Sequence, residues 1–219
     1  MNPKGRKLLL MTHITVSVGW IGAVLAYLAL VIAAMTGHSD PLLRGAWIGL
    51  ELIGWYVLVP LAFAALISGI GIALGTPWGL VRHYWVVISL LLTVGATAVL
   101  VQHMTTVSSF ASMAADAAMA DVSGVLGPAL RGELLHAGLG LVILLGIETM
   151  NVYKPRGLTA YGRRRSGVVA DSTSHAVGRG ELATPRVPRW VHAVWIHAAA
   201  LLLVLAVMHL AGGGLQLHN

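Results

Sequence analysis

Five long apolar runs constrain this chain more than any other feature of its sequence. They lie at about residues 8–35, 47–74, 84–107, 134–152 and 191–211, and an α-helix needs about 20 such residues to cross a bilayer. The chain is only 10% charged, whereas soluble domains carry about 25% charged residues. We therefore expect an all-α protein of the cell membrane: one domain, residues 1–219, forming a polytopic bundle of five transmembrane helices.

The basic residues predict how these helices are oriented. Of the 14 lysines and arginines, only Arg44 and Arg131 fall in the connections after the first and third runs. The others precede the first run, or lie between the second and third or between the fourth and fifth. Cytoplasmic loops carry an excess of Lys and Arg, so we expect a cytoplasmic N-terminus and an outer C-terminus. The charge of +6 is explained by this topology, and we expect no nucleic-acid partner.

Two connections differ in character. Residues 153–189 are rich in Gly, Ser and Arg and lack apolar periodicity, which predicts a flexible cytoplasmic loop. Residues 108–122, SSFASMAADAAMADV, are rich in alanine and place Phe110, Met113 and Ala117 at helical spacing. Here we expect a short amphipathic helix that lies on the outer face of the membrane.

The chain contains ten histidines and no cysteine, which excludes thiolate metal sites, disulfides and covalent c-type haem. In the expected topology the ionisable residues of the spans form two layers. The inner layer contains His13, His83, His192, His197 and Glu148, and the outer layer contains His103, His136, His209, Glu51 and Glu133. Ionisable residues in a membrane span are costly and by default indicate a functional site.

Two layers of imidazole predict haem b first, because its iron takes axial histidines from facing helices and small residues leave room for the porphyrin. We expect bis-histidine ligation, by His13 or His83 with His197 inside, and by two of His103, His136 and His209 outside. One or two haems would carry electrons across or within the membrane, with a quinone or a redox protein as partner. His83 and His103 are about 160° apart around their helix. The two layers would therefore use different helix pairs, or only one layer would bind haem.

Two other classes of protein stay open. Methionine adjoins histidine at His103–Met104, and thioether with imidazole suits Cu(I), so a copper-handling or other metal-handling protein is the first alternative. A mixed site of Glu51, His103, His136 and His209 would bind zinc or iron, or relay protons. The second alternative is a non-catalytic membrane subunit whose histidines serve packing. Lipid is the expected surrounding partner, and a homo-oligomer is left open.

Two stretches resemble segments of a family of small multi-span actinobacterial membrane proteins without an established activity. They are residues 8–30, LLLMTHITVSVGWIGAVLAYLAL, and residues 75–104, GTPWGLVRHYWVVISLLLTVGATAVLVQHM. The resemblance implies a helical membrane protein, with family-like motifs at His13, Trp20, Trp78, Arg82, His83 and Tyr84. In general plan the chain is also similar to cytochrome b-type bundles and copper-resistance membrane proteins, which is an analogy of architecture alone.

Overall fold

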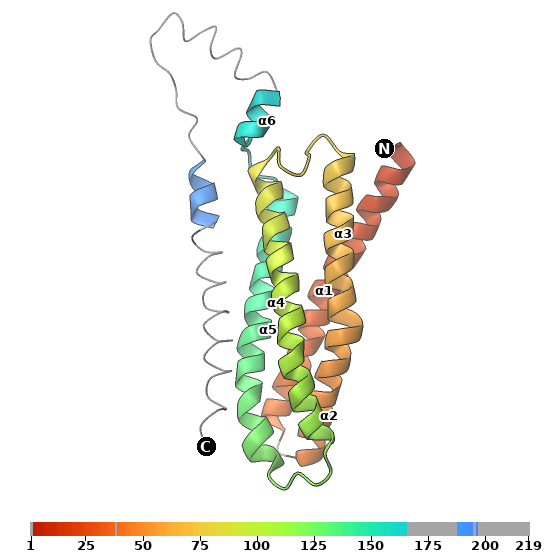
Figure 1. Ribbon diagram of the computed structural model, residues 1–219, viewed down its shortest axis with the longest axis vertical. Coiled ribbons are helices and arrows are strands. Elements are labelled where there is room, and N and C mark those ends of the chain that lie inside the picture. Colours follow the sequence, from red (N-terminus) through yellow and green to blue (C-terminus); the bar gives the residue numbers. More distant parts are fainter. Residues whose placement is uncertain (1, 38, 166–187, 195, 197–219) are drawn as a thin grey trace, which may run out of the picture.

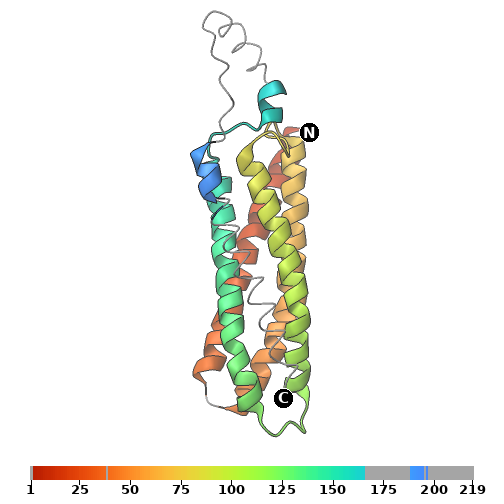
Figure 2. The same cartoon turned by 60° about the vertical axis from the view of Figure 1, so that its left-hand side comes forward.

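The computed structural model describes residues 2–37, 39–165, 188–194 and 196, and these residues form a bundle of long helices (Figures 1 and 2). The elements are α1 (Pro3–Thr36), α2 (Asp40–Ile53), the π-helix η1 (Gly54–Leu58), α3 (Val59–Gly75), α4 (Tyr84–Ala115), α5 (Val122–Tyr153) and α6 (Ala160–Arg165). Since α2, η1 and α3 run on as one helix, four helices are long and apolar enough to cross a membrane.

The prediction of a helical fold is confirmed for the described residues, which contain an isolated β-bridge but no strand. Four of the five predicted spans correspond to these helices. The fifth, residues 191–211, lies almost entirely outside the described residues, so the number of five spans stays a prediction. His197 and His209 also lie outside them.

The long helices are apolar on their exposed faces as well as on their buried ones. Leu8, Ile67 and Val142 are each more than half exposed, although they lie in the predicted spans. A helix that is apolar all round belongs in a large core or in a membrane. Because these side chains lie on the outside of the bundle, they are suited to contact lipid.

The two ends of the bundle differ in charge. One end, here called the basic end, contains the start of α1, the α3–α4 connection and the residues after α5 (Figure 1). Most of the described lysines and arginines lie there. At the opposite end, Arg44 donates to the carbonyls of Ala114, Asp116 and Met119 at 2.8, 2.6 and 3.0 Å. One of the two arginines at that end thus donates hydrogen bonds to carbonyls at and just after the C-terminus of α4.

The prediction of a separate amphipathic helix over residues 108–122 is wrong. Residues 108–115 continue α4, a short connection follows, and α5 begins at Val122, 12 residues before the predicted span. The sequence from 96 to 116 contains no Gly or Pro that would break the helix. The hydroxyls of Thr105, Ser109 and Ser112 also donate to carbonyls three or four residues earlier. These bonds let polar residues remain helical.

Helix α4 approaches the second span closely where that span changes its winding. Pro60 has no N–H to give to the carbonyl four residues earlier, and the π-helical turn lies directly before it, with the N–H of Val59 bonded to the carbonyl of Gly54. The side chain of Met104 occupies the space that a Cβ on Gly54 would need. The absence of a side chain there brings α4 close to the second span, next to His103.

The start of the predicted flexible loop is ordered at the basic end. Residues 154–159 run beside the α3–α4 connection, where Tyr84 N bonds to Gly157 O at 3.2 Å and Thr159 N bonds to Arg82 O at 3.0 Å. The indole of Trp190 donates to the carbonyl of Arg156 at 3.0 Å. The remainder of that loop, residues 166–187, lies outside the described residues.

Candidate functional site

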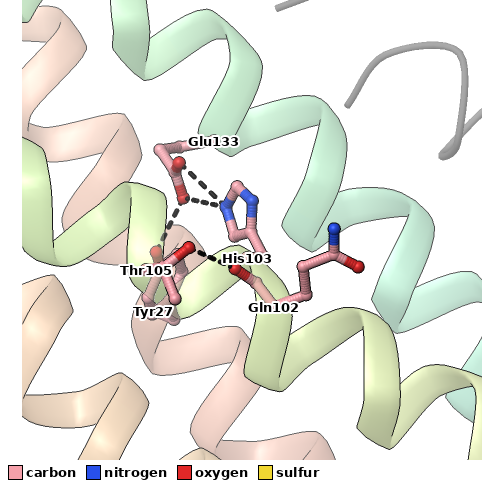
Figure 3. A network of polar contacts seen from close by, with 5 residues as sticks. All are labelled: Tyr27, Gln102, His103, Thr105 and Glu133. Carbon is pink, nitrogen blue, oxygen red and sulfur yellow. Dashed lines mark hydrogen bonds and ion pairs between the residues drawn. The ribbon is translucent and has the colours of Figure 1, made fainter. Parts of the chain in front are cut away.

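Three polar side chains from three helices meet inside the apolar bundle (Figure 3). Tyr27 comes from α1, His103 from α4 and Glu133 from α5, and their exposed fractions are 4%, 9% and 3%. We call them the Glu133 cluster. A carboxylate buried this deeply is strongly destabilising unless it is paired and hydrogen-bonded. Its partners are therefore a requirement of the fold as well as a feature of the site.

Both oxygens of Glu133 have partners. The hydroxyl of Tyr27 donates to Oε2 at 2.7 Å, and Nε2 of His103 lies 2.9 Å from Oε1 and 3.1 Å from Oε2 (Figure 3). A carboxylate only accepts hydrogen bonds, so Nε2 carries the hydrogen when Glu133 is ionised. The contact between His103 and Glu133 is then a direct line along which a proton can move.

His136 extends the cluster by one ring. It lies one helical turn after Glu133 on α5, and its imidazole stacks on that of His103 with ring centroids 3.6 Å apart and 12° between the planes. Two positive charges at this distance would repel strongly in a medium of low dielectric constant.

A cavity of about 70 Å³ adjoins the cluster. Its walls are mostly apolar, with Trp20 from α1 and the small residues Ala96, Ala137 and Gly140 from α4 and α5, and its polar lining includes Tyr27, His103, Glu133 and His136. One water needs about 10–15 Å³ of such volume and two or more polar partners. The cavity thus meets both requirements for holding a few water molecules beside the cluster.

A second group of polar residues lies toward the basic end. Nδ1 of His13 is 2.9 Å from Oγ of Ser68, whose own hydroxyl hydrogen goes to the carbonyl of Ala64 at 2.6 Å. Ser68 must therefore accept from Nδ1, which leaves Nε2 of neutral His13 as an acceptor. Gly69 makes room for the ring, because a Cβ there would lie 3.2 Å from Cε1 of His13.

His13 borders a smaller cavity of about 30 Å³, whose polar lining also includes Ser17, Thr93, Glu148 and Asn151. Within its described part, the structure gives Glu148 no side-chain hydrogen bond. The carboxylate is only half-buried, and the cavity between it and His13 is large enough for water. We call His13 and Glu148 the inner pair.

The structure brings some of the predicted ligands together and separates others. His103 and His136, two of the three predicted outer histidines, are in contact. His83 does not border the cavity beside His13; its Nδ1 contacts the carbonyl of Trp78 at 2.9 Å and its ring packs edge-on against that indole. Glu51 is half-buried and borders neither cavity.

A porphyrin or a single metal ion does not fit between the outer imidazoles as they lie here. The stacked rings of His103 and His136 leave no gap for an axial pair, and ligand pockets of drug size occupy about 300–1,000 Å³, far more than this cavity. Among the described residues, no group of three or more His, Asp or Glu side chains is placed to hold a metal ion. Haem and metal binding stay predictions, since His197 and His209 lie outside those residues.

Two residues of the site are not singled out in the sequence analysis. Tyr27 is one, and its signal is the seven-residue spacing His13–Trp20–Tyr27, which places all three within about 40° on one face of α1. Ser68 is the other, and nothing in the sequence around it marks it. Glu133 was placed at the correct height but not paired with His136, although their E-x-x-H spacing puts them on one face of a helix.

Comparison with known proteins returns no match: no family model, no curated protein and no solved structure is similar to this chain. The four long apolar helices are compatible with a helical membrane protein, which is the coarser part of what the family resemblance implies.

Proposed function

We propose that this protein transfers protons within the membrane and that Glu133 is its central proton-binding group. The observation that carries the proposal is a carboxylate with 3% exposure, bound directly to an imidazole and a phenol inside an apolar helix bundle. Chains of Glu and His in membrane spans are typical of proton relays.

Each member of the cluster has a distinct role in this proposal. A proton on Nε2 of His103 moves to Glu133 along the 2.9 Å contact, so that the ion pair becomes a neutral pair. Tyr27 keeps its donor on Oε2 and thereby holds the carboxylate in place. Both His103 and His136 border the cavity, so water there can carry the proton between the two stacked imidazoles and on from His136.

In the orientation that we propose, the basic end faces the cytoplasm and the Glu133 cluster lies in the outer half of the bilayer. The excess of basic residues at the N-terminal end of the bundle supports this orientation. Residues 191–211 would supply a fifth span, which their length and apolar composition support. Lipid is then the partner of the exposed apolar faces.

A second candidate function is electron transfer through haem b. What favours it is that both outer imidazoles border one cavity lined by the small residues Ala96, Ala137 and Gly140. To admit a porphyrin, the two stacked rings would have to separate and this cavity would have to widen. His103 or His136 would hold the iron together with His209, and His13 would pair with His197. Bound haem would supply one-electron chemistry, with a quinone or a redox protein as the partner.

Proton flux into liposomes tests the proposal. The full-length protein is reconstituted with a trapped pH-sensitive dye, and a potassium diffusion potential drives protons inward. We expect a flux above that of protein-free liposomes, reduced about tenfold or more by Glu133→Gln, because general acid–base groups contribute at least that much to proton transfer. An equal flux for Glu133→Gln and the unmodified protein would contradict it.

Glu51→Gln is the matched control, since it neutralises another carboxylate within a span that borders neither cavity. Its flux should equal that of the unmodified protein. An absorption spectrum of the same preparation, oxidised and then reduced, tests the second candidate. A Soret band that shifts on reduction would support haem, and a featureless spectrum after expression with added haem would reject it.

A further inference from the structure

The helices that build the Glu133 cluster also build the cavity beside the inner pair. On α1, His13, Trp20 and Tyr27 follow one another at seven-residue spacing along one face. On α5, Glu133 and Glu148 are 15 residues apart, which places them about 60° apart around the helix and about 22 Å apart along it. The two carboxylates thus point to the same side of α5, toward α1 and α4.

The two cavities share part of their walls. Trp20 of α1 and Leu144 of α5 border both of them, and both side chains are buried. Polar side chains line the space on either side of these two residues, whereas the shared wall itself contains an indole and an aliphatic side chain. The polar groups of the bundle therefore form two sections separated by an apolar one.

We infer that the Glu133 cluster and the inner pair are two proton-binding sites on a single path through the bundle, and that Trp20 and Leu144 form the barrier between them. The inference rests on the proposed function. It assigns to His13 and Glu148 the exchange of protons with the basic end, which is close because α5 ends at Tyr153. The species that occupies the cavities is water.

The geometry explains why two sites are needed. A separation of about 22 Å is too long for direct transfer between the carboxylates. His13 presents Nε2 as an acceptor, and Ser17, Thr93 and Asn151 provide the polar partners that water needs in the smaller cavity. At the barrier, a hydrophobic constriction blocks conduction by excluding water. A small movement of Leu144 or Trp20 would join the two sections.

Two variants test the path in the liposome flux assay. Glu148→Gln should reduce the flux about tenfold or more, as expected for an essential proton-transfer group, with Glu51→Gln as its control. Leu144→Ala should raise the flux severalfold, because it widens the barrier. Leu145→Ala is its control: the same change at the next residue, which is half exposed on the outside of the bundle, should leave the flux unchanged.

The outcomes separate this inference from the proposed function. If Glu133→Gln lowers the flux but Glu148→Gln does not, the proposed function stands and the path through the inner pair is rejected. A flux that Leu144→Ala leaves unchanged rejects the barrier. If Glu133→Gln has no effect, the proposed function itself fails. Should Leu144→Ala not fold, as judged by gel filtration and thermal unfolding, Leu144→Val makes the same test with a smaller change.

Discussion

The Glu133 cluster and the inner pair place the same kinds of group in opposite halves of one bundle, yet their environments differ. Glu133 is buried and bonded directly to side chains of two other helices. Glu148 is half-buried, borders a cavity with His13 and has no side-chain hydrogen bond to a described residue. A carboxylate that is removed from water must be paired, whereas one that keeps some access to water need not be.

The packing of large side chains also differs between the two halves of the bundle. Of the largest fully buried side chains among the described residues, only Ile88 lies in the half toward the basic end; the others are Trp47, Leu50, Met104, Leu126, Leu130, Val31 and Val107. Well-packed interiors hold side chains in place. The Glu133 cluster thus lies among closely packed side chains, with the larger cavity beside it, whereas the inner pair borders the smaller cavity and lies where fewer large side chains are fully buried.

The largest expected effect on stability comes from removing Glu133, and it tests the contrast between the two carboxylates. Glu133→Ala should lower the free energy of unfolding in detergent by about 3–5 kcal/mol, because it leaves buried partners of a charged group unpaired. Glu148→Ala should change it by about 1 kcal/mol or less, because that carboxylate has no side-chain hydrogen bond to a described residue that its removal would break. Chemical unfolding followed by circular dichroism measures both. Equal losses for the two variants would contradict the contrast.

Alanine substitutions at three glycines test the difference in packing between the two halves of the bundle. Gly54→Ala should destabilise the protein by about 1–3 kcal/mol through overpacking, because the new Cβ meets the buried side chain of Met104. Gly69→Ala, whose Cβ lies 3.2 Å from His13, should have a smaller effect. Gly146→Ala is the control, since its Cβ meets nothing within 4 Å. Thermal unfolding ranks the three, and a neutral Gly54→Ala would disagree with the packing described.

Tyr27→Phe removes one donor from the cluster without changing its shape. The loss should be about 1–2 kcal/mol, the range for a hydrogen bond between membrane helices, and proton flux should fall less than in Glu133→Gln because His103 still contacts the carboxylate. Unfolding and flux are measured on the same preparation. A fall in flux as large as that of Glu133→Gln would instead place Tyr27 on the path itself.

The smallest expected effect is that of Ser68→Ala in the inner half. Loss of the bond to His13 should lower stability by about 0.6 kcal/mol, the average for side-chain bonds in membrane bundles. It should also remove the contact that keeps the hydrogen of neutral His13 on Nδ1. Nitrogen NMR of labelled histidine detects the tautomer, and a His13 signal unchanged by the substitution would mean that Ser68 does not determine it.

Much of the fold could be predicted from the sequence because a span needs only length and apolarity. The extension of α4 beyond the predicted span could not, because Ser and Thr in residues 105–112 resemble a connection until their bonds to carbonyls are known. The predicted outer layer correctly groups His103 with His136. The central place of Glu133 could not be predicted, because the depth of a residue along its helix does not show which neighbouring helix the side chain faces.

In the proposed function, Glu133 takes up and releases a proton inside the bundle. Infrared difference spectroscopy of the reconstituted protein between neutral and acidic pH measures this directly, because a protonated carboxylic acid has its own carbonyl stretching band. We expect a band from a buried carboxylic acid in the unmodified protein that is lost in Glu133→Gln and kept in Glu51→Gln. The same band at full intensity in Glu133→Gln would contradict it.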